Sequence, residues 1–269
     1  MRAVLFVPAT RPERFAKALG SGADAVIIDL EDAVEASLKD QARESVRAFA
    51  RSQPDTPFLL RVNAVDTPWF EDDLALCAEC VGLQEVLLPK AESAVQVARA
   101  ATSGRPVLPI IESAAGVLAL GELAHAAGVS RLSCGTIDLM LDMGTRPDTP
   151  GARDVLQHVR TQLLLHSAVA GLAAPLDGVH PDFSDKDGLA AAAVLARDMG
   201  FGGMLCIHPA QVPVIQSVFA PDAAELDWAR RVVEQAEATG SFAFQVDGKM
   251  VDAPVIARAR QLLEAAPSA

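Results

Sequence analysis

The sequence predicts an α/β fold, a (β/α)8 TIM barrel followed by a C-terminal helical cap. Short apolar segments recur along the chain with helical patterns between them, as in proteins built from a parallel sheet. Acidic or basic residues stand at the carboxyl end of most of these segments. After Pro221 two alanine- and charge-rich helical patterns follow without a strand to return them to the sheet, which indicates a separate cap.

Eight apolar segments of strand length lie within the first 220 residues. They are Ala3–Val7, Ala25–Leu30, Phe58–Val62, Glu85–Leu88, Val107–Ile111, Arg131–Cys134, Pro175–Val179 and Met204–Ile207. The helical patterns that alternate with them are Glu13–Leu19, Leu38–Ser52, Thr67–Cys80, Ala94–Thr102, Gly116–Ala127, Ala152–Ala170, Asp185–Met199 and Gln211–Phe219. Such a regular alternation fits a closed barrel better than an open sheet.

The predicted domains are residues 1–220, the barrel, and residues 221–269, the cap segment. Two helical patterns of the cap, Ala223–Thr239 and Pro254–Ala265, flank a stretch with little predicted strand, SFAFQVDGKMVDAP. We expect the apolar residues of this stretch to lack local partners and to bury against the barrel or a neighbouring subunit. They are Phe242, Phe244, Val246, Met250 and Val251.

Composition excludes several classes of protein. The chain has 269 residues, 51% of them hydrophobic, and a formal net charge of −12, which argues against a nucleic-acid partner. No apolar run approaches the roughly 18 residues needed to cross a membrane, and Met1-Arg2 leads directly into a strand pattern, so we expect a cytoplasmic protein. Cys77 and Cys80 have CxxC spacing, but they fall within a predicted helix and lack two further zinc ligands.

The stretch LPIIESAAGVLAL carries a carboxylate, Glu112, from a buried strand into a helix start. A buried carboxylate is costly unless it is paired, hydrogen-bonded or bound to a metal, and a helix-capping or ion-paired Glu is one explanation. In a second stretch of this kind, VSRLSCGTIDLMLDMG, Asp138 follows an apolar strand and a turn of small residues. Acids at successive strand ends of a parallel barrel converge, and such an oxygen pair suits Mg²⁺.

Other charged residues follow the remaining strands. Arg11 and Lys17 come after the first strand, where a helix N-terminus and two cations could hold a pyrophosphate, although solvated surface charge is the alternative. The second strand ends in DLED, which places Asp29 near the core. Arg61 emerges from the third strand and needs anionic neighbours if it is buried, with Asp29, Glu31, Glu112 and Asp138 as candidates.

Taken together, LFVPATRPERFAKALGSGADAVIIDLEDAV, RVN, LPKAE, PIIESAAG, GTIDLMLDMG, PLDGV, IHPAQ and DGKMVDAP resemble the citrate lyase beta-subunit-like branch of the HpcH/HpaI aldolase family. The resemblance covers essentially the whole chain. It implies Mg²⁺, a coenzyme A thioester substrate and a homo-oligomer, trimeric or hexameric. The activity it implies is that of a carbon–carbon lyase of the oxo-acid-lyase type, which cleaves citramalyl-CoA, malyl-CoA or citryl-CoA to acetyl-CoA and a 2-oxo acid.

The resemblance also implies roles for individual residues. Glu112 and Asp138 match the metal ligands, with Glu112 contacting the substrate as well. The implied catalytic residues are Arg61, which also binds substrate, Asp29 and Asp252, the cap aspartate that reaches a neighbour's active site in relatives. Further substrate-binding positions are Phe6, Arg11, Lys17 and Pro209. Met204 stands where many relatives have Lys, which suggests weaker contact with the coenzyme A phosphates.

Three other functions remain open on the sequence. A malyl-CoA-type thioesterase would use the same metal and substrate and add water to the thioester. A citryl lyase subunit of a multienzyme citrate lyase would take its acyl group from an acyl carrier protein, whereas Arg11 and Lys17 favour free coenzyme A. A phosphate-binding barrel isomerase is disfavoured, because GFGGM precedes the eighth predicted strand and a phosphate loop should follow it.

Overall fold

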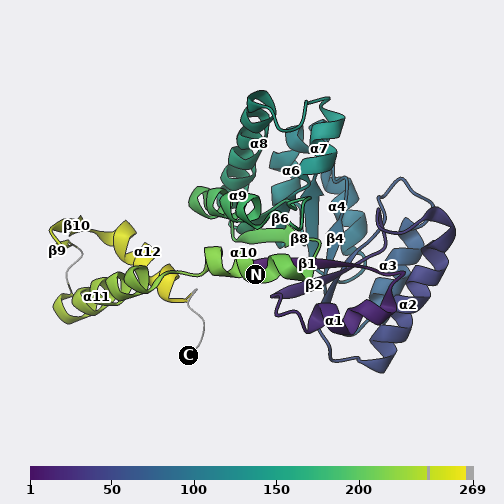
Figure 1. Cartoon of the computed structure of the whole chain (residues 1–269), viewed down its shortest axis with the longest axis horizontal. Helices are drawn as coiled ribbons and strands as arrows, with labels where there is room; N and C mark the ends of the chain where they lie inside the picture. Colours follow the sequence, from purple (N-terminus) through teal and green to yellow (C-terminus); the bar gives the residue numbers. More distant parts are fainter. Residues whose placement is uncertain (241–242, 265–269) are drawn as a thin grey trace. The chain divides into compact units, whose positions relative to one another are not determined.

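The first unit of the chain is a closed parallel barrel. The structure is a computed structural model that describes residues 1–240 and 243–264. Its contacts divide the chain into two units, Met1–Gln216 and Ser217–Ala269. In the first unit the strands pair in chain order from β1 to β8, and β8 pairs with β1 (Figure 1). They are β1 (Ala3–Pro8), β2 (Ala25–Asp29), β3 (Phe58–Arg61), β4 (Leu83–Leu88), β5 (Val107–Ile111), β6 (Arg131–Cys134), β7 (Ala173–Asp177) and β8 (Gly203–Cys206).

The barrel interior is filled by one aliphatic side chain or more from most strands. Its core cluster consists of Val4, Ile27, Leu59, Leu87, Leu108, Ile110, Leu176 and Leu205. Strand side chains alternate between two faces, so the residues next to these point outward to the helices. Because every strand runs in the same direction, all eight carboxyl ends meet at one rim, where barrel enzymes carry their sites.

Helices surround the strands of this unit (Figure 1). They are α1 (Phe15–Leu19), α2 (Lys39–Ser52), α3 (Phe70–Glu79), α4 (Ala94–Ala101), α5 (Ala114–Leu118), α6 (Leu120–His125), α7 (Thr136–Asp142), α8 (Pro150–Val169), α9 (Lys186–Met199) and α10 (Val212–Phe219). Short 3-10 turns occur at Pro12–Arg14, Ala36–Leu38 and Pro209–Gln211. Where side-chain caps form, they follow the sequence: Ser93 and Gln96 make a capping box at the start of α4.

The predicted barrel is confirmed, and the elements differ from the prediction mainly at their ends. β7 begins at Ala173 and ends at Asp177, so Val179 lies in the following loop. The helix expected over Gly116–Ala127 is two short helices, α5 and α6. The short helix α7 after β6 was not predicted, and it is the helix that carries Asp138.

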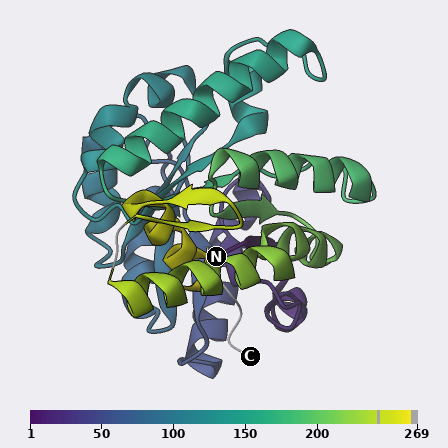
Figure 2. The same cartoon turned by 90° about the vertical axis from the view of Figure 1, so that its left-hand side faces the viewer.

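The second unit has a core of its own. It contains α11 (Ala223–Thr239), a two-stranded antiparallel hairpin of β9 (Phe244–Val246) and β10 (Lys249–Val251), and α12 (Ala253–Glu264) (Figure 2). Six buried residues form its core cluster: Ala229, Val232, Val246, Val251, Ile256 and Ala259. The expectation that the cap's apolar residues lack local partners is therefore wrong for Val246 and Val251, and for Phe244, which packs against this cluster. Met250 is 71% exposed, and its burial against another surface stays a prediction.

The hairpin was missed because its strands are only three residues long. Its turn is nevertheless marked in the sequence by Asp247-Gly248, whose φ angles of 52° and 73° both lie in the left-handed region. Two positive φ angles in succession are typical of the tight turns that join antiparallel strands. Phe242, also expected to be a buried apolar residue of the cap, lies outside the described residues.

Two sequence expectations about segments and cysteines can be compared with the structure. Within residues 1–240 and 243–264, no helix combines the length and the apolar character that a membrane span requires. Cys77 and Cys80 are both buried and free, and burial raises the pKa of both thiols, that of Cys80 to about 11. Their thiols are therefore protonated near neutral pH, which fits packing in the core and gives no reactive thiolate.

Candidate active site

Glu112 lies directly after β5 at the carboxyl rim of the barrel, and it is 4% exposed. The next residue, Ser113, caps α5 by accepting a hydrogen bond from Gly116 N, so the chain turns sharply and Glu112 stays at the strand end. The backbone N–H of Lys90 donates to Glu112 Oε1 at 2.7 Å. Burial and the nearby carboxylates of Glu31 and Asp138 raise the pKa of Glu112 to about 7. The protein therefore holds this carboxylate in an environment that favours a proton or a cation.

Asp138 stands in the first turn of α7, directly beyond the end of β6. The two acids approach because the connection passes through Gly135, where no side chain fits. A Cβ atom at position 135 would lie 2.4 Å from Glu112 Oε2 and 2.5 Å from Glu112 Cβ. Glu112 and Asp138 both line an inner cavity of about 70 Å³ and an adjoining outer cavity of about 460 Å³. The predicted convergence of the two strand ends is thus present in the structure.

The donor set suits a hard divalent cation. Among the described residues, no group of three or more His, Cys, Asp or Glu side chains is arranged to hold a metal, so a protein-only cage is absent there. A site with two carboxylates leaves the remaining positions to water and substrate oxygens, which is how Mg²⁺ is commonly bound. The raised pKa of Glu112 is consistent with this, because a cation beside it would relieve the repulsion from Glu31 and Asp138.

Arg61, at the end of β3, is held by two acids, Asp29 at the end of β2 and Glu31 in the loop that follows. Its Nε and Nη2 donate to the two oxygens of Asp29, each at 2.7 Å, and its Nη1 lies 2.9 Å from Glu31 Oε2. The guanidinium also lies 4.8 Å from the centre of the Phe6 ring. These neighbours raise the pKa of Arg61 despite its burial. Arg61 and Phe6 line the inner cavity together with Glu112 and Asp138.

Asp29 is 1% exposed, and its carboxylate is fully used within the protein. Besides Arg61, it accepts hydrogen bonds from the backbone N–H groups of Glu31 and Ala33. A carboxylate with these four contacts orients a neighbour, and it has little capacity left to bind a substrate atom. The sequence offered Asp29 both as an anionic neighbour of Arg61 and as a catalytic residue, and the contacts describe the first of these.

Lys90 links the two sides of the rim and was not assigned a role from the sequence. Its backbone N–H reaches Glu112, while its Nζ forms an ion pair with Glu31. Partial burial works against the charged amine, but the contact with Glu31 raises the pKa of Lys90 to about 12. Its φ of 49° is unusual for a residue other than glycine. Such a backbone conformation is often found where a site fixes a side chain or an amide group.

A third cavity, of about 320 Å³, collects most of the residues expected to contact the coenzyme A group. Phe6, Lys17 and Pro209 line it, and Arg14 supplies a second cation. Arg11 does not belong to this lining; its Nε donates instead to Glu13 at 2.6 Å on the exposed surface. The turn at Pro12–Arg14 decides which arginine faces the cavity, a detail that the spacing of charges in the sequence does not reveal.

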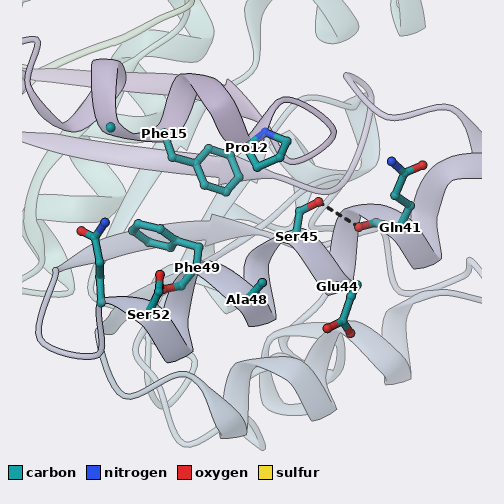
Figure 3. Close-up of a pocket in the computed structure, with 10 residues that line it drawn as sticks. Pro12, Phe15, Gln41, Glu44, Ser45, Ala48, Phe49 and Ser52 are labelled. Atoms are coloured by element: carbon teal, nitrogen blue, oxygen red, sulfur yellow. Dashed lines mark hydrogen bonds between the residues drawn. The ribbon is translucent and has the colours of Figure 1, made fainter.

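A larger cavity, of about 630 Å³, lies away from the strand ends between α1 and α2 (Figure 3). Phe15 and Phe49 both line it and pack edge to face, with ring centroids 5.4 Å apart. The polar groups drawn around it are satisfied locally: Ser45 Oγ donates to Gln41 O in its own helix, and Glu44 pairs with Arg47. It lacks convergent polar groups and is not the candidate site.

Asp252 belongs to the second unit, where it caps α12: its Oδ1 accepts a hydrogen bond from Val255 N at 3.4 Å. Met204 lies in the middle of β8 and is 2% exposed. Its neighbour Leu205 belongs to the barrel core, so the Met204 side chain points outward to the helices. The suggestion that Met204 weakens contact with the coenzyme A phosphates stays a prediction.

The fold and the rim of charged strand ends are those of a (β/α)8-barrel enzyme. The chain belongs to the HpcH/HpaI aldolase/citrate lyase family, which matches residues 2–209. It is 40% identical over 274 residues to a citrate lyase subunit beta-like protein of Mycobacterium tuberculosis, across 98% of this chain and 95% of the relative. It is 37% identical over 271 residues to a (3S)-malyl-CoA thioesterase of Cereibacter sphaeroides, across 97% of this chain and 93% of the relative.

A solved structure gives the same result for the fold. CitE from Mycobacterium tuberculosis, in complex with magnesium, acetoacetate and coenzyme A, superimposes with a TM-score of 0.84 at 37% sequence identity. The match covers 98% of this chain and 97% of CitE. Both units of the present chain therefore have counterparts in a protein whose crystals contain magnesium and coenzyme A.

Proposed function

We propose that this protein is a Mg²⁺-dependent carbon–carbon lyase. It cleaves a 3-hydroxy-3-carboxyacyl-CoA, citramalyl-CoA by preference over malyl-CoA or citryl-CoA, to acetyl-CoA and a 2-oxo acid. The observation that carries the proposal is the inner cavity, which places the Arg61 guanidinium and the carboxylates of Glu112 and Asp138 around one small space. An arginine fork and a cation site together can bind a 2-hydroxy acid through its carboxylate and hydroxyl oxygens.

The roles of the protein's own residues follow from this arrangement. Glu112 and Asp138 would hold the ion, which supplies Lewis acidity and orientation when it is bound. Arg61, held rigid by Asp29 and Glu31, binds the substrate oxygens on which negative charge develops. The apolar side chains around it, including Ile110 and Leu205, limit the access of water to the reacting carbon.

Cleavage breaks the bond between the hydroxyl-bearing carbon and the methylene carbon next to the thioester. The hydroxyl releases its proton to solvent water as it becomes the carbonyl of the 2-oxo acid, and the electron pair of the broken bond passes to the acetyl-CoA enolate. Asp252 returns a proton to the enolate carbon, and it removes that proton in the condensation direction. Asp29 acts through Arg61 and does not touch the substrate, a narrower role than the sequence suggested.

The coenzyme A part of the substrate is assigned to the cavity lined by Phe6, Arg14, Lys17 and Pro209. Phe6 lines this cavity and the inner one, so a thioester could extend from one into the other past its ring. Arg14 and Lys17 provide the positive charge that the phosphates need on a chain whose net charge is −12. This favours free coenzyme A over an acyl carrier protein as the acyl donor.

We assign the active form to a homo-oligomer, a trimer or hexamer, in which Asp252 acts in a neighbouring subunit. The exposed side chain of Met250, two residues before Asp252, is one apolar group that such an interface would cover. The test is to refold Asp252→Ala and Glu112→Gln chains together. Mixed oligomers should regain part of the activity, whereas a mixture that forms and stays inactive would place Asp252 in the active site of its own chain.

A thioesterase is the second candidate, because a relative with that name aligns along almost the whole chain. It would use the same cation, Arg61 and coenzyme A cavity, and differ in admitting water to the thioester carbonyl. The experiment that separates the candidates offers citramalyl-CoA, malyl-CoA and citryl-CoA to the purified protein with Mg²⁺. Acetyl-CoA together with pyruvate, glyoxylate or oxaloacetate supports the lyase. Free thiol without acetyl-CoA would reject it in favour of the thioesterase.

A further inference from the structure

A buried lysine at the start of α2 holds the loop that supplies the partners of Arg61. Lys39 is 5% exposed, although the sequence around it resembles the solvent face of an amphipathic helix. Its Nζ donates to the carbonyl oxygens of Leu30 and Glu31, each at 2.7 Å, and to Asn63 Oδ1 at 2.6 Å. An ammonium group has three N–H donors, and all three are used here.

These contacts join the ends of two neighbouring strands. The carbonyls of Leu30 and Glu31 belong to the loop after β2, and Asn63 follows β3 by two residues. The Arg61–Asp29 pair bridges the same two strand ends, since Asp29 pairs with Arg61 in the sheet register. Lys39 therefore connects the backbone on both sides of the ion pair that orients Arg61.

A second row of buried groups fixes the orientation of Asn63. Its backbone N–H and its Nδ2 both donate to Asp73 Oδ2, at 2.8 and 2.6 Å, and Asp73 is fully buried. With both donors engaged, the amide directs its Oδ1 towards Lys39. Arg43, one turn beyond Lys39 on α2, contacts the other oxygen of Asp73 at 3.1 Å. Arg43 thus supports the network without touching the loop after β2.

Burying a charged lysine is unfavourable unless its hydrogen bonds are complete, and it stabilises a fold less than well-packed apolar residues do. We therefore attribute this network to the positions in which it holds the loop after β2 and the end of β3. We propose that Lys39 is a positioning residue of the candidate site: it fixes the chain at the end of β2 so that the carboxylates of Asp29 and Glu31 hold the Arg61 guanidinium beside the inner cavity. For its activity readout the proposal rests on the proposed lyase function.

The test compares Lys39→Met with Arg43→Met, two substitutions of buried cations on one face of α2. Both should lower the melting temperature. At a temperature where both variants are folded, Lys39→Met should lose roughly ten- to a hundredfold in kcat, because small displacements of a positioned group are enough for such losses. Arg43→Met should lose markedly less. Equal losses of kcat in the two variants would show that Lys39 supports the fold and does not position Arg61.

A double-mutant cycle with Arg61→Lys separates positioning from general stability. If Lys39 acts through the arginine fork, Lys39→Met should add little to the loss already caused by Arg61→Lys, since interacting residues are not additive. The same fold-loss of kcat in both backgrounds would overturn the proposal. Lys39→Gln, which keeps an amide donor for part of the network, should recover part of the activity and provides a measurement if Lys39→Met fails to fold.

A crystal structure of the lysine variant gives a readout that does not depend on activity. In Lys39→Met or Lys39→Gln, the two contacts of 2.7 Å between Arg61 and Asp29 should lengthen or be lost. Their persistence unchanged would contradict the proposal. If the wild-type protein cleaves none of the thioesters, the proposed function fails, and this structure still decides whether Lys39 positions Arg61.

Discussion

The two sides of the barrel rim treat charge in opposite ways. On the side of β2, β3 and β4, the cations that line the rim are paired with acids: Arg61 with Asp29 and Glu31, and Lys90 with Glu31. On the side of β5 and β6, neither Glu112 nor Asp138 forms an ion pair with a residue of the described chain. The first side is complete as the protein folds, and the second is short of positive charge. This difference locates the place where a cation would be bound.

Glu112→Gln should have the largest effect on activity, and it tests whether the side of β5 and β6 binds a cation. The amide keeps the size of the side chain and can still accept the hydrogen bond from Lys90 N, but it loses the negative charge. We expect loss of Mg²⁺-dependent turnover by at least about a thousandfold, because removal of one preorganised electrostatic group alone is worth about 10²–10³. Steady-state kinetics over a range of Mg²⁺ concentrations measures this. Unchanged activity in the folded variant would contradict the assignment of Glu112 as a metal ligand.

The same substitution should raise the stability of the fold, although it lowers turnover. In the folded chain the pKa of Glu112 is about 7, above its ordinary value of 4.5. Between these pH values the unfolded chain releases its proton while the folded chain keeps it, so the free energy of unfolding falls as pH rises through the window. Without metal at pH 8, Glu112→Gln should therefore be more stable than wild type by up to about 3 kcal/mol.

Urea unfolding in the presence of a chelator, at pH 4 and pH 8, measures this difference. The gain should vanish at pH 4, where both states carry the proton. Glu122→Gln, an exposed position on α6, is the matched control and should show no such pH dependence. A gain of equal size at both pH values would mean that burial of the charge is not its cause.

On the side of β2, β3 and β4, Arg61→Lys keeps the positive charge and removes the planar guanidinium group. Lysine cannot make the two parallel contacts with Asp29, so the head group should move within the inner cavity. We expect turnover to fall well beyond about tenfold, with a smaller change in melting temperature than a loss of charge would cause. A rate near that of the wild type would show that pairing on this side serves stability alone.

The smallest effects concern the cations of the coenzyme A cavity. Arg14→Met and Lys17→Met should each raise KM for the thioester by about two- to fivefold, as expected for partly exposed charges, and the difference should shrink in high salt. Arg11→Met is the control, because Arg11 is paired with Glu13 outside this cavity. An equal rise of KM in the control would show that the effect comes from long-range charge and not from this cavity.

The parts of the site that follow from strand periodicity could be predicted. Each acid or arginine at a strand end was found because an apolar run places it at a known depth, and the parallel topology brings those ends together. Lys39 and Asp73 could not be found in this way. A charged residue in an amphipathic helix predicts a solvent-facing position, and only the packing of α2 and α3 against the loop after β2 shows that both are buried.

The prediction and the structure differ where short-range geometry decides the outcome. Arg11 and Arg14 are equivalent in a charge pattern and both are exposed, but only Arg14 lines the cavity. The core of the second unit was missed for a related reason. Its strands are too short for a period to be detected, and the Asp247-Gly248 turn that creates them was not given weight.

Gly135 has a consequence for how this protein can vary. Since a single methyl group at position 135 would collide with the Glu112 carboxylate, every substitution there should displace a candidate metal ligand. Gly151, at the start of α8, has open space where a Cβ would lie. In a library of single substitutions selected for activity, position 135 should remain glycine while position 151 accepts many residues. The contrast between these two positions would thus report the crowding around Glu112 without any knowledge of the substrate.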